Sequence, residues 1–394
     1  MVRTMVAGVG MIPFAKPGQS EDWDVMAEKA MRQALEDAGL GYDSVQQGYA
    51  GYVYADSTAG QSSFYRIGCT GIPIFNVNNN CSTGSSALFL GRQAIESGMA
   101  DCVLVVGFEQ MMPGALGMVF NDRRRTLDFH ISKQIEIQGW DDAVPLVAQQ
   151  FGGAGLDYQA RHGIADEVFG MISVKARRHA ARNPLAMLRA PITLDEVMSS
   201  TPLYGPLTRF MACPPTCGAA AAVLVSSTFA TRYGLSASVE IVAQSMTTDY
   251  ADTFTGRSMM SVVGYDMTKA AAHQVYEQAG VGPDDIEAVE LHDCFATNEL
   301  ITYEALGLCA EGGAEAYIRD GRNTYGGDHV TNPSGGLLSK GHPLGATGLA
   351  QCYELTHQLR GTAGDRQVEN VRHALQHNLG IGGACVVTLY RNAA

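Results

Sequence analysis

The sequence predicts an α/β protein made of two similar halves with an inserted loop domain, and three observations support this. Short apolar runs alternate with helix-like patterns along most of the chain, which is typical of α/β architecture. Residues 30–45 resemble residues 271–286, since in both a helix ends at Ala-Gly and a polar turn leads into a strand-like run. Between them, residues 121–235 have a different character, with many prolines and clustered arginines.

The elements that carry this prediction are short strands and two amphipathic helices. Each expected strand is an apolar run next to glycines or polar residues: residues 6–10, 72–77, 103–107, 286–291 and 373–380. Each expected helix opens at a turn of small residues and carries periodic apolar side chains: residues 85–97, which stop at Gly98, and residues 349–359.

The composition excludes several classes of protein. The 394 residues include 40 acidic and 27 basic side chains, and the net charge of -13 disfavours a nucleic-acid partner. Nine cysteines, an odd number spread along a long chain, favour a reducing compartment over a disulfide framework. No apolar run approaches the roughly 18 residues that a membrane-spanning helix requires. With neither a signal-peptide pattern nor a C-terminal peroxisomal tripeptide, a cytoplasmic protein is expected.

The inserted segment, residues 121–235, is mildly basic within an acidic protein. Its basic residues gather at 123–125 and at 177–182. A charge cluster of this kind is most often a solvated surface. It also suits an anionic cofactor such as the phosphates of coenzyme A, although the sequence does not single out the residues that would contact CoA.

Cys81 lies in a turn between an expected strand and an expected helix. The run NNNCSTGSSA, residues 78–87, follows the strand at 72–77 and opens the helix that stops at Gly98. Free N–H groups and the dipole at a helix N-terminus favour a thiolate, so we expect a lowered pKa and a nucleophilic sulfur. The same N–H groups can stabilise an oxyanion. The alternative is a small buried cysteine that fills the turn.

His342 occupies the corresponding turn of the second half. The run GHPLGATG, residues 341–348, also consists of small residues before a helix. Gly345 follows His342 by three positions, as Gly84 follows Cys81. If the halves are similar, the two helix N-termini are expected to face each other at one site, where a neutral imidazole can act as base for a thiol.

The run His292-Asp293-Cys294 directly follows the expected strand at residues 286–291. These residue types suit a zinc site, but an acid–base cluster agrees better with the other two motifs, and a second thiol can move a proton to carbon. His373 and His377 have the spacing of a zinc-binding helix, but their segment is expected to be a strand and lacks the glutamate. No metal is therefore expected.

Together these segments resemble the thiolase family, and specifically the sterol-carrier-protein-type thiolases. The resemblance extends over essentially the whole chain and rests on NVNNNCSTGSSALFLGRQAIESG, HDCFATNELITYEALGLC, NPSGGLLSKGHPLGATGLAQ and HNLGIGGACVVTLY. The HDCF block stands where other thiolases carry an Asn-Glu-Ala motif. Most thiolases have a second cysteine in the final glycine-rich loop, where this chain has Asn378. Thr216 and Cys217 replace a Ser/Asn-Asp pair of relatives, which puts one loop-domain hydrogen bond in doubt.

The resemblance implies a thiolase-like, five-layered αβαβα fold. Residues 1–120 would form the N-terminal half, completed by about 236–265. Residues 121–235 would form the loop domain, and residues 266–394 the C-terminal half.

The resemblance also implies roles for the site residues. Cys81 would be the acyl-accepting nucleophile, His342 its base, and Cys294 the acid/base that protonates the departing enolate. His292 and His342 would stabilise the enolate oxygen, and the N–H groups of Cys81 and Gly380 would form a second oxyanion hole. Coenzyme A would be a co-substrate rather than a permanently bound cofactor.

The function implied is that of a 3-ketoacyl-CoA thiolase, an acyltransferase that cleaves 3-ketoacyl-CoA with CoA in fatty acid or sterol side-chain metabolism. One alternative is a condensing or acyl-transfer enzyme of a biosynthetic complex, since the same residues serve both directions. Another is a non-catalytic, thiolase-like lipid-binding subunit. The family also implies a homodimer.

Overall fold

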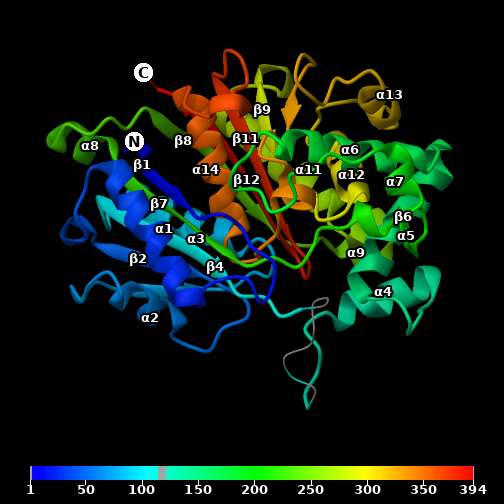
Figure 1. Cartoon of the computed structure of the whole chain (residues 1–394), viewed down its shortest axis with the longest axis horizontal. Coiled ribbons are helices and arrows are strands. Elements are labelled where there is room, and N and C mark those ends of the chain that lie inside the picture. The colour runs from blue at the N-terminus through cyan, green and yellow to red at the C-terminus, as the bar shows by residue number, and fades with distance from the viewer. Residues whose placement is uncertain (1, 114–119, 121, 394) are drawn as a thin grey trace.

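A large central sheet organises the chain (Figure 1). The structure is a computed structural model that describes residues 2–113, 120 and 122–393. Its strands are β1 (Thr4–Met11), β2 (Gln47–Gly51), β3 (Ile74–Val77), β4 (Cys102–Glu109), β5 (Pro202–Tyr204), β6 (Leu207–Thr208), β7 (Gly218–Ser226), β8 (Val239–Thr247), β9 (Ala288–Glu290), β10 (Val330–Thr331), β11 (His373–Gly380) and β12 (Ala384–Asn392).

The strand order of the sheet is symmetric about its centre. Within the described residues, ten strands pair in the order β10-β9-β11-β12-β8-β1-β7-β4-β2-β3. Read outward from the centre, β1-β7-β4-β2-β3 corresponds to β8-β12-β11-β9-β10. The halves join where β1 and β8 pair antiparallel, Thr4 opposite Ile241 and Val6 opposite Val239. The expectation of two similar halves is confirmed.

Helices cover both faces of each half and also separate the halves. They are α1 (Trp23–Ala38), α2 (Ala59–Tyr65), α3 (Thr83–Glu96), α4 (Asp128–Gln138), α5 (Leu146–His162), α6 (Glu167–Ala180), α7 (Leu194–Met198), α8 (Ser227–Tyr233), α9 (Ala251–Thr255), α10 (Met259–Val262), α11 (Tyr265–Ala279), α12 (Ala296–Ala305), α13 (Ala314–Arg319) and α14 (Thr347–Arg360). None of the helices among the described residues is long and apolar enough to cross a bilayer.

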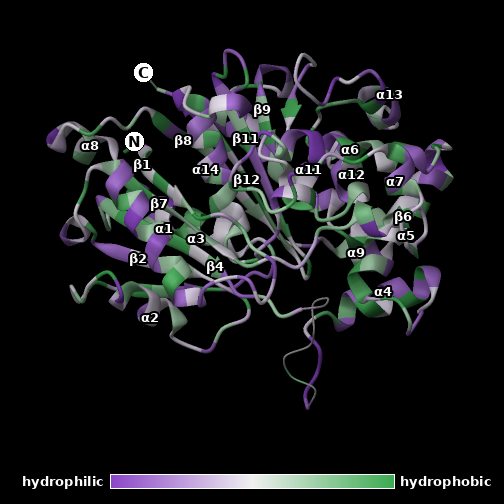
Figure 2. Ribbon diagram, in the orientation of Figure 1, coloured by the Kyte–Doolittle hydropathy of each residue, from purple (hydrophilic) through white to green (hydrophobic). Residues whose placement is uncertain are grey.

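The helices and the two half-sheets form the five layers implied by the resemblance. α1 packs on β1, β7 and β4, and α11 packs on β8 and β12, so each covers the outer face of one half. α3 and α14 pack against each other and against strands of both halves, which makes them the central layer. Figure 2 shows apolar residues along β7 and both apolar and polar residues on α1, as expected for a helix with one buried face.

The two segments that resemble each other in sequence occupy equivalent positions. α1 ends at Gly39, with φ 66°, and α11 ends at Gly280, with φ 67°. Glycine is favoured at both because this left-handed conformation crowds a Cβ. A 3₁₀ turn follows each helix, Tyr42–Ser44 or Pro283–Asp285, and leads into β2 or β9. The internal duplication therefore repeats a helix–turn–strand unit.

Strand pairing differs from the domain boundaries expected from sequence at two places. β7 lies within residues 121–235, assigned to the loop domain, yet it pairs with β1 and β4 of the N-terminal half. β8 lies within residues 236–265, assigned to the N-terminal half, yet it pairs along its length with β12. The bounds of the inserted segment rested on composition and the completion of the N-terminal half on the family resemblance, and neither encodes the tertiary partners of a strand.

The rest of the inserted segment, α4 to α7 with the β5–β6 hairpin, packs on the C-terminal half. α6 contacts α12 and a π-helical turn, Gly336–Lys340, and α5 contacts α10 and α12. Phe151 of α5 stacks on Phe295, with ring centroids 4.9 Å apart. The inserted helices therefore cover the segment that follows the His-Asp-Cys run.

Candidate active site

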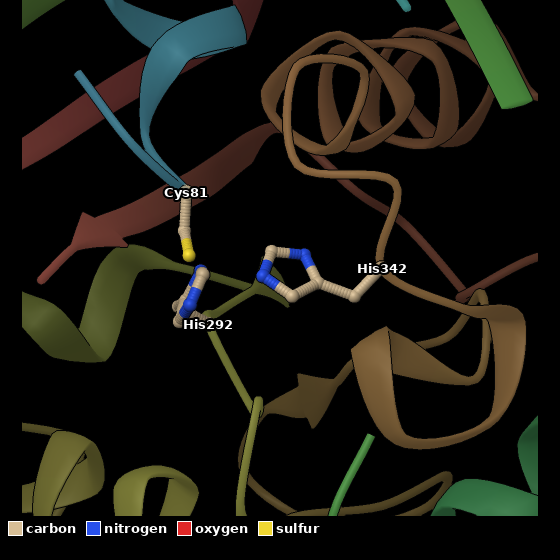
Figure 3. Close-up of side chains that lie close together, drawn as sticks. All are labelled: Cys81, His292 and His342. Carbon is tan, nitrogen blue, oxygen red and sulfur yellow. The ribbon is translucent and has the colours of Figure 1, made fainter. Parts of the chain in front are cut away.

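Cys81, His292 and His342 converge from three distant segments (Figure 3). The sulfur and one ring nitrogen from each histidine all lie within 4.8 Å of one another, and all three residues are buried. The two imidazole rings meet edge to face, with centroids 5.0 Å apart. The structure thus brings together three of the four catalytic residues expected from the sequence.

The Cys81 turn joins β3 to the N-terminus of α3. Asn80 has φ 52°, a left-handed conformation that asparagine tolerates better than most residues. The N–H of Ser82 donates to Asn79 O (3.2 Å), which closes the turn. The Asn80 side chain donates to Ile381 O (3.0 Å) and so ties the turn to the glycine-rich loop after β11.

Burial sets the protonation state of the Cys81 thiol. Burial, and after it the Glu109 carboxylate, raise the pKa of Cys81 to about 12, although the N–H groups of Cys81 and Ile381 favour the anion. The expected lowering of this pKa by the helix N-terminus is therefore wrong, because desolvation of the thiolate outweighs those N–H groups. Cys81 is a neutral thiol that needs a base.

His342 offers the lone pair that this thiol requires. The Thr347 hydroxyl donates to Pro343 O (3.0 Å), so it accepts the Nδ1–H of His342 across 2.7 Å. The His342 Nε2 is then unprotonated, and it is buried without a hydrogen-bond partner among the described residues. Burial lowers the pKa of His342 to about 3, so the ring is neutral at physiological pH.

Thr216 holds the backbone of His342. Its hydroxyl donates to Pro214 O (2.8 Å) and accepts the N–H of His342 (3.0 Å). Thr216 stands where the sequence departs from its relatives, and its side chain supplies a hydrogen bond from the inserted segment to the base.

Glycines allow the two turns to meet. A Cβ on Gly84 would lie 2.7 Å from Gly345 O, and a Cβ on Gly348 would lie 2.2 Å from the Ser85 hydroxyl. A Cβ on Gly380 would lie 2.2 Å from Asn79 O. Because no side chain fits at these positions, the N-termini of α3 and α14 approach backbone to backbone. The sequence-based expectation that these helix N-termini face each other is confirmed.

His292 is held by groups from β11. Its Nδ1 lies 2.9 Å from Asn378 Nδ2, which donates to it, so the neutral ring keeps its proton on Nε2. Its backbone N–H donates to Nδ1 of His377 (3.4 Å). Burial, with smaller effects of His342 and His377, lowers the pKa of His292 well below its usual value.

The other two residues of the His-Asp-Cys run have separate surroundings. The Asp293 carboxylate accepts the N–H groups of Leu337 (2.6 Å) and Leu338 (3.3 Å), which fixes the turn that leads to the base. Cys294 is 6% exposed, and burial, followed by the Cys213 thiol, raises its pKa well above the usual value. Cys294 therefore keeps its proton, and it lies outside the group of three that meets within 4.8 Å.

Sequence reasoning missed Glu109, the last residue of β4. Its carboxylate accepts N–H groups of Val53 (3.1 Å), Tyr54 (2.9 Å) and Gly345 (3.1 Å). Burial raises its pKa to about 7. Glu109 thus joins the segment after β2 to the turn of the base, and the available signal was an acidic residue ending an otherwise apolar strand.

Cys213, in the inserted segment, lies next to Cys294. Its N–H donates to Cys294 O (2.9 Å), next to a bridge between Ala212 and Phe295. Burial, and after it the Cys81 thiol, raise the pKa of Cys213. It is therefore a neighbour of both expected catalytic thiols.

The basic clusters of the inserted segment are not uniformly available to phosphates. His179 is buried between Asn332 O (3.0 Å) and the Thr324 hydroxyl (2.7 Å), and burial lowers its pKa to about 3. Arg123 and Arg124 are exposed and form ion pairs with Asp122 and Asp128 of their own segment. Of these basic residues, Arg123 and Arg124 are accessible to an anion, whereas His179 is not.

The cluster of Cys81, His292 and His342 resembles a zinc donor set in residue types. Zinc bound to Nε2 of His292 would require the ring proton on Nδ1, where the Asn378 amide already donates. The arrangement favours acid–base chemistry over metal coordination.

Comparison with known proteins agrees with this site. The family profile "Thiolase, N-terminal domain" matches residues 4–186, and "Thiolase C-terminal domain-like" matches residues 249–390. The chain belongs to the thiolase family. Within it the chain is a sterol-carrier-protein-type thiolase, since sterol carrier protein 2 of Oryctolagus cuniculus is 53% identical over 99% of this chain and 72% of that protein.

Other thiolase relatives match along nearly their whole length. The non-specific lipid-transfer protein-like 2 of Caenorhabditis elegans is 44% identical over 99% of this chain and 96% of its own. Human mitochondrial 3-ketoacyl-CoA thiolase superposes with a TM-score of 0.76 at 18% identity, over 100% of this chain and 99% of that chain, which supports the fold. Like its family, this thiolase is an acyltransferase.

Proposed function

We propose that this thiolase cleaves 3-ketoacyl-CoA with free CoA through an acyl-enzyme on Cys81. One observation carries the proposal: the Cys81 sulfur lies within 4.8 Å of two neutral imidazoles, and the Nε2 lone pair of His342 is buried without a partner among the described residues. A buried neutral thiol beside a free imidazole lone pair is an activated nucleophile of the thiol–histidine type.

The first half of the reaction breaks the carbon–carbon bond. Nε2 of His342 takes the Cys81 proton while the sulfur attacks the ketone carbon of the substrate. The bond between that carbon and the carbon next to the thioester breaks, which leaves an acyl group on Cys81 and a thioester enolate. Nε2–H of His292 donates to the enolate oxygen, together with the newly protonated His342. The Cys294 thiol protonates the enolate carbon, and acetyl-CoA or propionyl-CoA is released.

The second half transfers the acyl group to CoA. The Cys294 thiolate takes the proton of the CoA thiol, whose sulfur attacks the thioester on Cys81. N–H groups at the start of α3 and in the loop after β11 stabilise the tetrahedral oxyanion. Cys81 leaves and recovers its proton from His342, so every group returns to its starting state and a shortened acyl-CoA departs.

Three finer points belong to this proposal. CoA would reach the site past the inserted segment, where Arg123 and Arg124 offer exposed positive charge. A reducing compartment is part of the proposal, because the nine cysteines of the chain are free thiols in the structure. A homodimer is expected, and the surface that suits it is discussed below.

The test is mass spectrometry of the intact protein after brief exposure to acetoacetyl-CoA. We expect a gain of one acetyl group that maps to Cys81 and is removed by CoA. Cys81→Ala should abolish it, whereas Cys69→Ala, which removes an exposed thiol, should not. A folded protein that gains no acyl group from acetoacetyl-CoA or from longer and steroidal 3-ketoacyl-CoA substrates would contradict the proposal.

The direction of the reaction needs its own measurement, because the same groups serve condensation. Turnover of 3-ketoacyl-CoA plus CoA is compared with turnover of acetyl-CoA alone at equal enzyme concentration. Faster condensation, together with an acyl-enzyme on Cys81, would favour the biosynthetic alternative over thiolysis.

A further inference from the structure

Asn378 is the residue that connects the nucleophile to the imidazole of His292. It lies on β11, fully buried, where most thiolases would have a cysteine. One side-chain amide nitrogen makes two contacts: it donates to Cys81 O (3.2 Å) and to Nδ1 of His292 (2.9 Å). The Cys81 carbonyl can only accept, so the amide nitrogen must point toward it.

The orientation of this amide is fixed a second time by a buried chain of hydrogen bonds. The Tyr390 hydroxyl donates to Oε1 of Gln376 (2.5 Å), and Nε2 of Gln376 donates to the Ser85 hydroxyl (2.8 Å). That same nitrogen also donates to Gly348 O (2.8 Å), a carbonyl, which fixes the direction of the Gln376 amide. The Ser85 hydroxyl must then donate onward to Oδ1 of Asn378 (2.8 Å).

This chain of hydrogen bonds determines which ring nitrogen of His292 carries the proton. With Oδ1 of Asn378 accepting from Ser85, only the NH₂ group is available to Nδ1 of His292. Nδ1 must accept, and the single proton of the neutral ring resides on Nε2. The His342 ring has the opposite arrangement, since the Thr347 hydroxyl accepts from its Nδ1.

We propose that Asn378 is a positioning residue that keeps His292 as a hydrogen-bond donor, so that the two neighbouring imidazoles divide their tasks. His342 presents a lone pair to the Cys81 thiol, and His292 presents an N–H to the developing enolate oxygen. This inference rests on the proposed function for the identity of that oxygen. The assignment of the proton to Nε2 of His292 does not depend on it.

The carbon–carbon step should depend on this arrangement more than acyl transfer does. The enolate oxygen forms only when the carbon–carbon bond breaks, and it requires the N–H of His292. Acylation of Cys81 by a simple thioester requires the lone pair of His342 and the backbone N–H groups near Cys81. Loss of a single oxyanion donor costs about 10²–10³ in kcat.

The experiment combines nitrogen NMR with kinetics. The protein is labelled with ring-¹⁵N histidine, and the His292 signals are assigned with a His292→Gln variant. The wild type should show a protonated Nε2 and an unprotonated Nδ1 at His292. In Asn378→Asp, which keeps the shape but offers a carboxylate to Nδ1, that nitrogen should become protonated. Cleavage of acetoacetyl-CoA should fall about 10²–10³-fold, and Cys81 acylation by acetyl-CoA much less.

Asn183→Asp is the matched control. Asn183 is also buried, and its amide also donates to a backbone carbonyl, Ser334 O (2.9 Å), but it does not contact the site residues. This variant should leave the His292 signals and the ratio of the two rates unchanged.

Three results would overturn the inference. One is a wild-type spectrum with the proton on Nδ1 of His292, which needs no variant to fold. The others are an unchanged tautomer in folded Asn378→Asp, or equal losses in both half-reactions. If Cys81 accepted no acyl group at all, the proposed function would fail, but the tautomer measurement would still decide the role of Asn378.

Discussion

The protonation states of Cys81 and His342 follow from the same cause. Both side chains are buried, and burial disfavours whichever form is charged, so the pKa of the thiol rises to about 12 and that of the imidazole falls to about 3. The resting pair is therefore thiol and imidazole rather than thiolate and imidazolium. Proton transfer from sulfur to Nε2 belongs to the attack on substrate.

Alkylation of Cys81 as a function of pH tests this neutral pair. Since the thiolate is the reactive form and its pKa is raised to about 12, the alkylation rate with iodoacetamide should increase about tenfold per pH unit from pH 7 to pH 10. The rate is followed by peptide mass spectrometry, with the exposed thiol of Cys69 in the same digest as reference. A plateau below pH 8 would show a preformed thiolate and contradict the neutral pair.

The sequence predicted which residues meet at the candidate site better than it predicted their protonation states. Cys81 and His342 could be recognised because each lies in a local run of small residues that opens a helix. The raised pKa of Cys81 could not be recognised from the sequence, because it depends on burial of the thiol by segments far away in the chain. The contacts of Asn378 and the place of Glu109 at the site could not be predicted for the same reason, since their partners lie on other elements.

At the level of elements, the crossing of α3 and α14 sets the distance between Cys81 and His342. Gly84 and Gly348 lie in the first turns of these helices, where no Cβ fits against the other backbone. Directly beside this crossing, the Ser85 hydroxyl accepts a hydrogen bond from the Gln376 side-chain amide. The crossing therefore holds both the catalytic turns and the hydrogen-bond chain that reaches Asn378.

Gly348→Ala should disturb the crossing. The new Cβ would lie 2.2 Å from the Ser85 hydroxyl and 2.3 Å from its backbone nitrogen, so α14 has to move away from α3. We expect a destabilisation of about 1–3 kcal/mol and a lower kcat, because His342 moves with its helix. Thermal unfolding and thiolysis of acetoacetyl-CoA measure the two effects.

Gly91→Ala is the control for this prediction. It makes the same change within α3, but the nearest atoms to the new Cβ are side-chain methyl groups of Val105 (3.1 Å), Leu224 (3.3 Å) and Val103 (3.4 Å), which can adjust. A Gly348→Ala protein as active as Gly91→Ala would mean that the crossing does not control the geometry of the site.

The elements themselves were largely predictable, and their partners were not. The strand expected at residues 103–107 is β4, and the helix expected at 349–359 is α14. The strand is a continuous apolar run, as burial on both faces requires, and the helix carries apolar residues at helical spacing. β7 was assigned to the inserted segment because prolines and arginines precede it, yet it completes the N-terminal half-sheet. Its pairing with β1 and β4 is a long-range contact, which no local sequence pattern predicts.

At the level of the whole molecule, one edge of the sheet remains apolar and open. β3 pairs with β2, and its other edge has no partner strand within the described part of the chain. Phe75 of β3 is 45% exposed, and a nearby shallow groove is lined by Tyr49, Leu90 and Met99, of which Met99 is 74% exposed. An exposed apolar edge strand is a site for association, so we expect the homodimer to form here.

Phe75→Lys should weaken that dimer. A charge on the open edge has to be desolvated on association, so the dissociation constant should rise at least about tenfold. Size-exclusion chromatography with light scattering over a range of protein concentrations measures it. Phe129→Lys, at an exposed phenylalanine of α4, is the matched control. A monomeric wild type, or equal effects of the two substitutions, would contradict the prediction.

The continuous sheet has a consequence for how substrates enter. Many two-domain enzymes open and close by a hinge motion, with the reactive groups on opposite domains and a flexible hinge between them. Here Cys81 and His342 also come from opposite halves, but β1 and β8 join those halves within a single sheet, and glycine backbones touch across the middle. The two halves are therefore not connected by a flexible hinge about which they could rotate. We therefore expect admission of the proposed acyl substrate to depend on the inserted helices, which pack over the segment after the His-Asp-Cys run.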